Sequence, residues 1–246
     1  MSGRRFPGEV LRLAMWSGPR NLSTAMMYAF AARGDCTVSD EPFYAAYLAQ
    51  TETAHPMQAE ILAAHETDPT KIILNGDQLT PLWYQKHMPH HLLPTMPTAW
   101  MADCRHAFLI RHPARVIASY ARKRESPTLE DLGFTQQLRL FETITQLTGT
   151  PPPVIESTDI RANPGPMLRK LCDALDIPYT PNMLRWPAGP KPYDGAWAPV
   201  WYGAVHGSTG FETVEGPLPD LPPAYQILAD AAMPAFDALS THKLTA

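Results

Sequence analysis

Residues 17–24, with the sequence SGPRNLST, combine residue types that suit a bound phosphate group. They follow a short apolar run, Leu11–Trp16, and precede a segment of helical character, so we expect a loop that joins a strand to a helix. A helix N-terminus offers unpaired N–H groups and the positive end of the helix dipole to an anion. Arg20 adds a fixed positive charge, and Ser23 and Thr24 add hydroxyl groups.

Two observations limit what this loop can be. In a purely structural alternative, Asn21 or Ser23 serves only as the N-cap of the following helix. The loop also lacks the Gly-x-x-x-x-Gly-Lys-Ser/Thr spacing of nucleotide-hydrolysing P-loops. The sequence therefore argues against an ordinary ATP or GTP hydrolase.

A second group of basic and hydroxyl residues follows another predicted strand, Ala107–Ile110. Arg111 comes at the end of that strand, and Pro113 suits the first position of a helix, where a missing N–H costs nothing. Ser119 lies about 9 Å further along that helix. Of the 20 basic residues, six fall within residues 105–124, which indicates an anion site. The alternative is a basic helix face exposed to solvent.

Three side chains near the ends of predicted strands have the chemistry of a general base. Histidine titrates near neutral pH, so His87 and His90 are candidates, although loop histidines often make only ordinary hydrogen bonds. Glu41, after Cys36–Ser39, is the third, and its alternative role is an acid at a helix start. The histidines predict no metal site, because Pro89 interrupts their helical face and no fourth ligand is adjacent.

The elements that position these residues alternate between strands and helices over the first two thirds of the chain. This pattern predicts an α/β fold with a parallel sheet covered by helices on both faces, in which ligands bind at the carboxyl ends of the strands. The predicted strands are Leu11–Trp16, Cys36–Ser39, Lys71–Leu74, Leu82–Gln85, Ala107–Ile110 and Val154–Ile155. The predicted helices are Ser23–Arg33, Gln58–His65, Pro113–Arg124, Leu129–Leu147, Met167–Leu175 and Ala224–Leu239.

The composition limits the class of protein. The chain has 246 residues, 45% of them apolar, which suits one domain over residues 1–246 and excludes disorder as the main state. A net charge of −4 argues against a nucleic-acid partner. The N-terminal apolar run contains Arg12 and is too short for a signal peptide or a membrane span, and the three cysteines are scattered. We expect a cytoplasmic protein that has no membrane partner.

Proline is unusually frequent, at 27 of 246 residues, which is roughly twice the usual share. Residues 178–223 are rich in proline and aromatic side chains, and we expect them to be irregular. They form either a lid with an acceptor pocket or a small core beneath a long loop.

Together these segments resemble the sulfotransferase family whose members use 3′-phosphoadenylyl sulfate (PAPS). Residues 19–24, PRNLST, are similar to a bacterial Pro-Arg-Ser-Gly-Ser-Thr loop, and the spacing of Arg111 and Ser119 matches the family's second motif. Residues 86–94, KHMPHHLLP, resemble the family's Lys-Thr-His-Leu-Pro segment. Residues 154–178 resemble a later pattern of the same family.

The resemblance implies a three-layer P-loop NTPase-like α/β fold and transfer of a sulfuryl group from PAPS to a hydroxyl or amine of a small-molecule acceptor. The product is adenosine 3′,5′-bisphosphate (PAP), and no metal is required. Arg111 and Ser119 would bind the 3′-phosphate, and Lys86 would steady the transferring group while His87, His90 or Glu41 acts as base. The residues implied for the 5′-phosphosulfate are Gly18, Pro19, Arg20, Asn21, Leu22, Ser23 and Thr24.

The sequence departs from the family pattern at two places. Asn21-Leu22 replaces the usual Ser-Gly, and the C-terminal Arg-Lys-Gly loop is missing, so Lys191 is the nearest substitute as a cofactor ligand. These departures leave two alternatives: another phosphate-binding transferase or kinase on the same scaffold, or a catalytically silent nucleotide-binding protein. The acceptor, the choice of base and the oligomeric state do not follow from the sequence.

Overall fold

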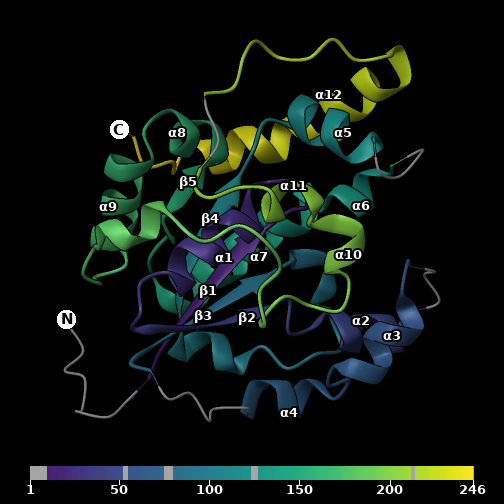
Figure 1. Ribbon diagram of the computed structural model, residues 1–246. Coiled ribbons are helices and arrows are strands. Elements are labelled where there is room, and N and C mark those ends of the chain that lie inside the picture. Colours follow the sequence, from purple (N-terminus) through teal and green to yellow (C-terminus); the bar gives the residue numbers. More distant parts are fainter. Residues whose placement is uncertain (1–9, 52–54, 75–79, 123–126, 212–213, 246) are drawn as a thin grey trace.

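A parallel sheet organises the protein (Figure 1). The computed structural model describes residues 10–51, 55–74, 80–122, 127–211 and 214–245. Within these residues, five strands pair in the order β2-β3-β1-β4-β5, and each neighbouring pair is parallel. The strands are β1 (Leu11–Ser17), β2 (Cys36–Asp40), β3 (Leu82–His87), β4 (Arg105–Ile110) and β5 (Val154–Glu156).

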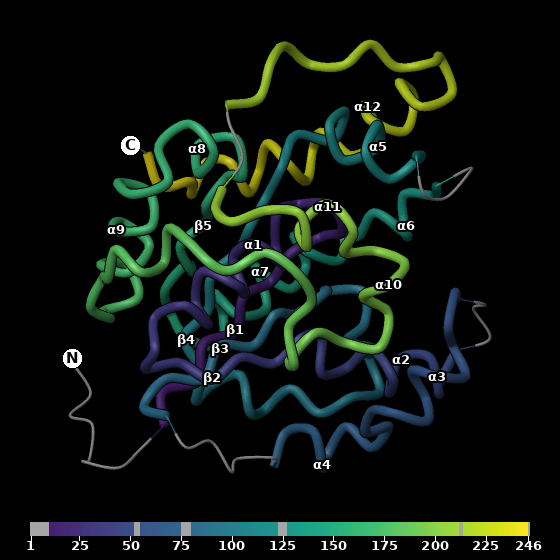
Figure 2. The backbone as a smooth tube through the Cα atoms, viewed as in Figure 1, coloured from purple at the N-terminus to yellow at the C-terminus, as the bar shows by residue number. Residues whose placement is uncertain are grey.

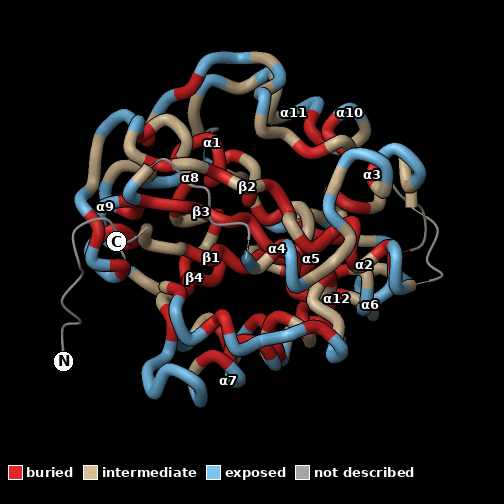
Figure 3. The backbone as a smooth tube through the Cα atoms, turned by 90° about the horizontal axis from the view of Figure 1, so that it is seen from below, coloured by how far each residue is buried: buried red, intermediate tan, exposed pale blue. Residues whose placement is uncertain are grey.

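Helices cover both faces of the sheet, so its central strands are buried, as Figure 3 shows in red. Leu13 and Met15 of β1 face one core with α1 (Ser23–Ala31) and α9 (Pro164–Ala174). Ala14 and Trp16 face the other core, which is completed by helices of the second layer. These helices are α5 (Pro113–Ala121), α7 (Phe134–Thr148) and α12 (Pro223–Ser240). Burial on both sides explains why β1 is a nearly continuous apolar run.

The strand order reverses direction at β1. The chain passes from β1 through α1 to β2 on one side, whereas from β4 it passes through α5 to β5 on the other. The loops that leave β1 and β4 therefore diverge and leave a crevice at their carboxyl ends, which is where ligands bind in open parallel sheets.

A segment between α9 and α12 crosses this carboxyl edge (Figure 2). Its bends are held by a third cluster of buried side chains, in which Tyr44 and Leu48 pack with Ile61, Trp197 and Tyr202. The remaining elements are short. They are α2 (Tyr44–Gln50), α3 (Gln58–Ala64), α4 (Pro69–Leu74), η1 (Pro89–His91), η2 (Ala99–Asp103), α6 (Leu129–Leu132), α8 (Ser157–Ala162), η3 (Pro181–Leu184), α10 (Ala198–Trp201) and α11 (Gly203–His206).

The structure confirms five of the six predicted strands and corrects the other. Lys71–Leu74 is the end of helix α4, which Pro69 begins, and the Asp68 carboxylate accepts a hydrogen bond from the N–H of Thr70. Only Ile72 of this apolar run is buried, in the same core as Trp16, whereas Leu74 is 72% exposed, so the run is one side of a surface helix and not a strand of the sheet.

Three predicted helices differ from the expectation: one is divided and two are shorter. The segment Leu129–Leu147 divides at Gly133, whose φ of 71° ends α6 and precedes α7. The helix predicted as Ser23–Arg33 ends at Ala31, and the one predicted as Pro113–Arg124 ends at Ala121, while residues 123–126 lie outside the described residues.

Two residues of α7 test this packing. Ile144 is fully buried in the core beneath β4, so Ile144→Ala should lower the free energy of unfolding by about 2–5 kcal/mol. Leu147, one turn later, is 47% exposed, and Leu147→Ala should change it by less than about 0.5 kcal/mol. Urea denaturation of both variants measures the difference, and equal losses would contradict the assigned face of α7.

Candidate functional site

A cavity of about 440 Å³ opens at the carboxyl edge of the sheet. Many of the side chains predicted from the strand ends line it. They are Pro19, Arg20, Asn21, Leu22, Ser23, Thr24, Glu41, Lys86, His90, Arg111 and Ser119. Three other predicted site residues lie outside its wall, namely Gly18, His87 and Lys191.

The loop between β1 and α1 is held in a constrained conformation. Arg20 and Leu22 both adopt left-handed backbone angles, with φ of 61° and 74°. The amide of Asn21 donates a hydrogen bond to the carbonyl oxygen of Leu109, 3.2 Å away at the end of β4. A Cβ atom on Gly18 would lie 2.9 Å from the carbonyl oxygen of Leu132, so only glycine fits there. Such strain concentrates at functional sites, where surrounding contacts maintain it.

The first turn of α1 faces this loop without a side-chain cap. Leu22 occupies the N-cap position, and within the described part of the chain no side-chain hydrogen bond caps the helix. The alternative in which Asn21 or Ser23 serves as the cap is therefore wrong. The N–H groups of the first turn are left for a ligand, because a helix end needs some partner for them.

Arg20 joins the two basic loops. Its Nε donates to the Ser119 hydroxyl at 3.0 Å, and its carbonyl oxygen accepts a hydrogen bond from Arg111 Nη1 at 2.7 Å. Burial, together with the charges of Arg111 and Arg122, lowers the pKa of Arg20. Positive charges gathered in this way favour an anion between them.

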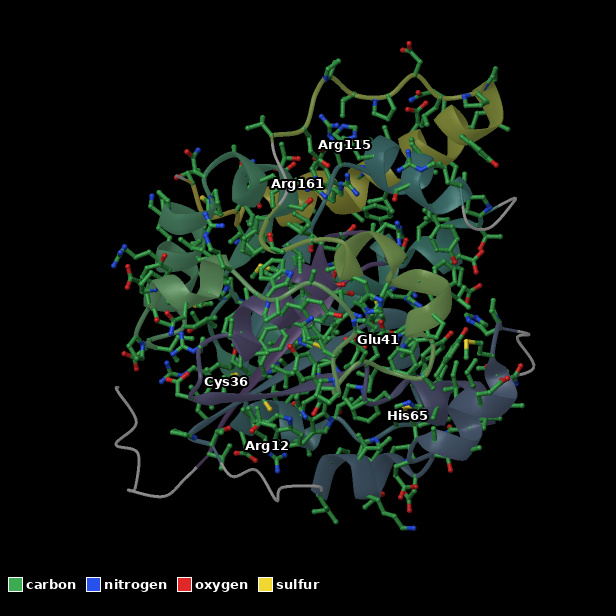
Figure 4. The ribbon with its side chains drawn as sticks, in the orientation of Figure 1. Arg12, Cys36, Glu41, His65, Arg115 and Arg161 are labelled. Atoms are coloured by element: carbon green, nitrogen blue, oxygen red, sulfur yellow. The ribbon has the colours of Figure 1, made fainter. Side chains whose placement is uncertain are left out.

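Arg111 also belongs to a cluster of basic side chains around one carboxylate. Arg111, Arg115 and Arg161 all contact Glu215, which lies in the segment before α12. Figure 4 shows Arg115 and Arg161 together on the α5 and α8 side of the site, whereas Glu41 lies toward α2.

The opposite wall of the cavity is built around the buried ammonium group of Lys86. Lys86 Nζ donates to Asp40 Oδ1 at 2.8 Å, to Glu41 Oε1 at 2.6 Å and to the Tyr202 hydroxyl at 2.6 Å. Although burial alone would lower the pKa of Lys86, the carboxylates of Asp40 and Glu41 raise it above its ordinary value. Lys86 is therefore a fixed positive charge on the cavity wall.

Glu41 has its two carboxylate oxygens in different surroundings. Oε1 accepts from Lys86, whereas Oε2 lies 3.6 Å from Nδ1 of His91, a residue that also lines the cavity. The backbone of Glu41 has a φ of 43°, and its N–H donates to the carbonyl oxygen of Lys86. Burial raises the pKa of Glu41 and the charge of Asp40 adds to this, although the neighbouring ammonium group of Lys86 acts in the opposite direction. A carboxylate with a raised pKa suits general base chemistry near neutral pH.

The family model described as a sulfotransferase domain matches residues 11–243 of the chain. The chain belongs to the sulfotransferase family.

Two solved structures of sulfotransferases share its fold. The sulfotransferase from Alicyclobacillus acidocaldarius superposes with a TM-score of 0.57 over 96% of this chain and 98% of its own, at 10% identity. The sulfotransferase domain of the olefin synthase from Synechococcus PCC 7002 gives a TM-score of 0.53 over 95% and 98%, at 16% identity. Both support the P-loop-like α/β architecture expected from the sequence.

Two curated relatives are more similar in sequence. These Arabidopsis thaliana proteins, named branched-chain-amino-acid aminotransferase-like proteins 1 and 2, are each 36% identical over 230 residues. The match covers 92% of this chain and 41% of each relative, so their names describe much longer proteins than this sulfotransferase-family chain.

Two partners of Lys86 were not among the residues predicted to bind the cofactor or to catalyse. Asp40 accepts hydrogen bonds from Lys86, from the Tyr202 hydroxyl at 2.7 Å and from the N–H of Gly195 at 3.0 Å. One signal was present, because Asp40 stands beside Glu41 at the end of a predicted strand. Tyr202 is one of the aromatic residues of 178–223 expected in an acceptor pocket or a small core, but no local pattern indicated its contact with Lys86.

His87 packs in the core. Its ring stacks on Trp16 with the centroids 4.5 Å apart, and burial lowers its pKa to about 3. His90 lines the cavity, and burial lowers its pKa to about 4, so it is neutral at pH 7. Of the two histidines proposed as bases, only His90 is placed beside the cavity.

Lys191 is occupied by contacts with its own loop. Its Nζ donates to the carbonyl oxygens of Pro187 at 2.7 Å and Gly189 at 2.5 Å, and it lies over the ring of Tyr28. These contacts argue against Lys191 as a substitute for the missing Arg-Lys-Gly loop.

The described ranges of the chain lack two features. They contain no group of three or more histidine, cysteine or acidic side chains arranged to hold a metal ion. They also contain no helix that is both long and apolar enough to cross a membrane.

The burial of His87 predicts a loss of stability in mild acid. Its pKa is about 3 in the folded chain against 6.5 ordinarily, so between these values the unfolded chain binds more protons, and stability falls as the pH drops below 6.5. At pH 5 the loss through His87 is about 2 kcal/mol. His87→Phe removes this titration and should reduce the difference in melting temperature between pH 7 and pH 5. An unchanged difference would contradict the assignment of His87 as a buried neutral ring.

Proposed function

We propose that this chain transfers a sulfuryl group from PAPS to a hydroxyl or amine of a small molecule. One observation carries the proposal: Arg20 bridges the loop before α1 and the Arg111–Ser119 segment, so two anion sites meet at one cavity. PAPS bears anionic groups at both its 5′ and its 3′ positions. A cavity with two linked cationic sites fits a ligand that has two anionic groups better than it fits a ligand that has a single phosphate.

The residues present fit this donor. The uncapped first turn of α1 and Arg20 would hold the 5′-phosphosulfate, and Arg111 with Ser119 would hold the 3′-phosphate. The buried Nε of Arg111 supports this fit, because none of the described residues accepts a hydrogen bond from it. When bound, PAPS supplies the activated sulfuryl group.

The side chains around the cavity would promote transfer mainly through charge and position. Negative charge develops on the leaving phosphate oxygen, and preorganised cations stabilise it where water is excluded. Arg20 and the N–H groups at the start of α1 stand on one wall, and Lys86 stands on the other. We therefore assign Arg20 and Lys86 to charge stabilisation.

Glu41 is the base that the geometry favours. It hydrogen-bonds to Lys86, whose ammonium group would steady the transferring sulfuryl group. The carboxylate of Glu41 would therefore stand close to the acceptor hydroxyl or amine and could take its proton. The aromatic residues Tyr44, Trp197 and Trp201 line the same cavity and would form the wall for the acceptor. His90 is the second candidate, because it lines the cavity as a neutral imidazole.

Binding of PAP tests the donor site. Arg111→Ala should weaken PAP binding at least about tenfold, since a charged hydrogen bond contributes roughly 1.5–3 kcal/mol. Arg139→Ala, on the exposed face of α7, removes an equal charge and should leave the affinity unchanged. Isothermal titration calorimetry measures the PAP affinity of the unmodified chain and of both variants. Absence of PAP binding to the unmodified chain would refute PAPS as the donor.

Transfer of labelled sulfate from PAPS to a panel of phenols, alcohols and amines tests the base. Glu41→Gln keeps the shape of the side chain but cannot accept the proton, so transfer should fall about 100-fold or more while PAP affinity stays within about threefold. His90→Gln should lower transfer by less than about tenfold. The reverse order of the two losses would assign the base to His90.

A further inference from the structure

Glu215 places a carboxylate in the middle of the arginine cluster. Its Oε1 contacts Arg111 Nη2 and lies 3.8 Å from Arg161 Nε. Its Oε2 lies 3.3 Å from Arg115 Nε and accepts a hydrogen bond from the Thr158 hydroxyl at 2.8 Å. Although burial alone would raise the pKa of Glu215, Arg111 and Thr158 lower it, so the side chain is a carboxylate at neutral pH.

The backbone on either side of Glu215 is exposed. Residues 214–217 form no helix or strand, and the chain then leaves the body of the protein as an open loop that returns at α12 (Figure 2). Val214 is 64% exposed, whereas the side chain of Glu215 is only 5% exposed. Arg115 donates to the carbonyl oxygens of Gly216 and Pro217, so the cluster that binds the carboxylate also holds this segment in place.

One carboxylate does not use the full capacity of the cluster. Arg111 and Arg115 both have this one carboxylate as their acidic partner among the described residues, so the pair keeps an excess of one positive charge. The buried Nε of Arg111 also has no acceptor among the residues that the structure describes. A phosphate monoester carries up to about two negative charges and three acceptor oxygens, so it matches these donors better than a carboxylate does.

We propose that Glu215 is a built-in competitor for the 3′-phosphate of the nucleotide, seated among Arg111, Arg115, Arg161 and Thr158 until that phosphate displaces it. The proposal rests on the proposed function, because it takes the arginine cluster as the 3′-phosphate site. It adds Arg115, Arg161 and Thr158 to that site. It also makes segment 214–217 the element that moves away when nucleotide binds.

Competition between Glu215 and the 3′-phosphate lowers the apparent affinity of the chain for the nucleotide. A nucleotide binds its full site only in the fraction of molecules whose Glu215 has left, so the carboxylate weakens the apparent affinity and its return favours release of PAP. A nucleotide without a 3′-phosphate does not compete with Glu215. Its affinity should therefore not depend on the charge at position 215.

The experiment compares PAP with AMP, which lacks the 3′-phosphate, by calorimetry on the full chain at one salt concentration. Glu215→Gln preserves the size of the side chain and removes its charge. It should tighten PAP binding about fivefold or more and leave AMP binding within about twofold. Glu142→Gln, on an exposed position of α7, makes the same change in net charge and should leave both affinities as they are. Melting temperatures confirm that each variant is folded.

The outcomes separate this proposal from the proposed function. If PAP binds the unmodified chain but Glu215→Gln binds it equally or more weakly, Glu215 is not a competitor, and the donor assignment stands. If Glu215→Gln tightens PAP and AMP alike, the effect is one of general charge and the proposal fails. If the unmodified chain and Glu215→Gln both bind no PAP, both proposals are refuted.

Discussion

The buried ammonium group of Lys86 is the interaction on which the site depends. A charge removed from water must be paired and hydrogen-bonded, or it destabilises the fold. The parallel pairing of β2 with β3 sets Asp40 opposite Lys86, and the left-handed turn at Glu41 brings a second carboxylate to the same nitrogen. Tyr202 completes the group from a distant part of the chain. One charge thus fixes the ends of two strands and the segment that covers them.

The cavity has walls of different charge, and this asymmetry would orient a ligand. Arginines from the loops after β1 and β4 form one side, whereas on the other side the Glu41 carboxylate and the Lys86 ammonium group, which also pairs with the buried Asp40, stand next to each other. A ligand with an anionic end would therefore bind that end against the arginines. The two walls meet at Arg20, whose Nη1 lies 3.4 Å from the carbonyl oxygen of Trp201 in the covering segment.

Sequence alone found many of the residues that line the cavity because they follow the strand ends. Arg20, Glu41 and Arg111 each come just after a strand, so a local pattern suffices to find them. The partners of Lys86 and Arg111 are harder to predict from the sequence, since Tyr202 and Glu215 lie 116 and 104 residues away along the chain. The helix at 69–74 was missed because a short apolar run fits a strand or a helix equally well. His87 was misplaced because neighbouring residues of a strand point to opposite faces, and its ring lies on Trp16.

The segment that covers the cavity begins and ends at one place. Arg185 and Gly210 form an antiparallel bridge, and the N–H of Trp186 donates to the carbonyl oxygen of Thr209 at 3.2 Å. Because the ends are paired with each other, the length and sequence between them can vary as long as Gly195 and Tyr202 keep their hydrogen bonds to Asp40 and Lys86. Residues 185–210 therefore form a natural cassette. Exchange of this cassette with Gly195 and Tyr202 retained is a route by which evolution, or a protein engineer, can remodel the aromatic wall around Trp197 and Trp201 while Lys86 keeps its partners.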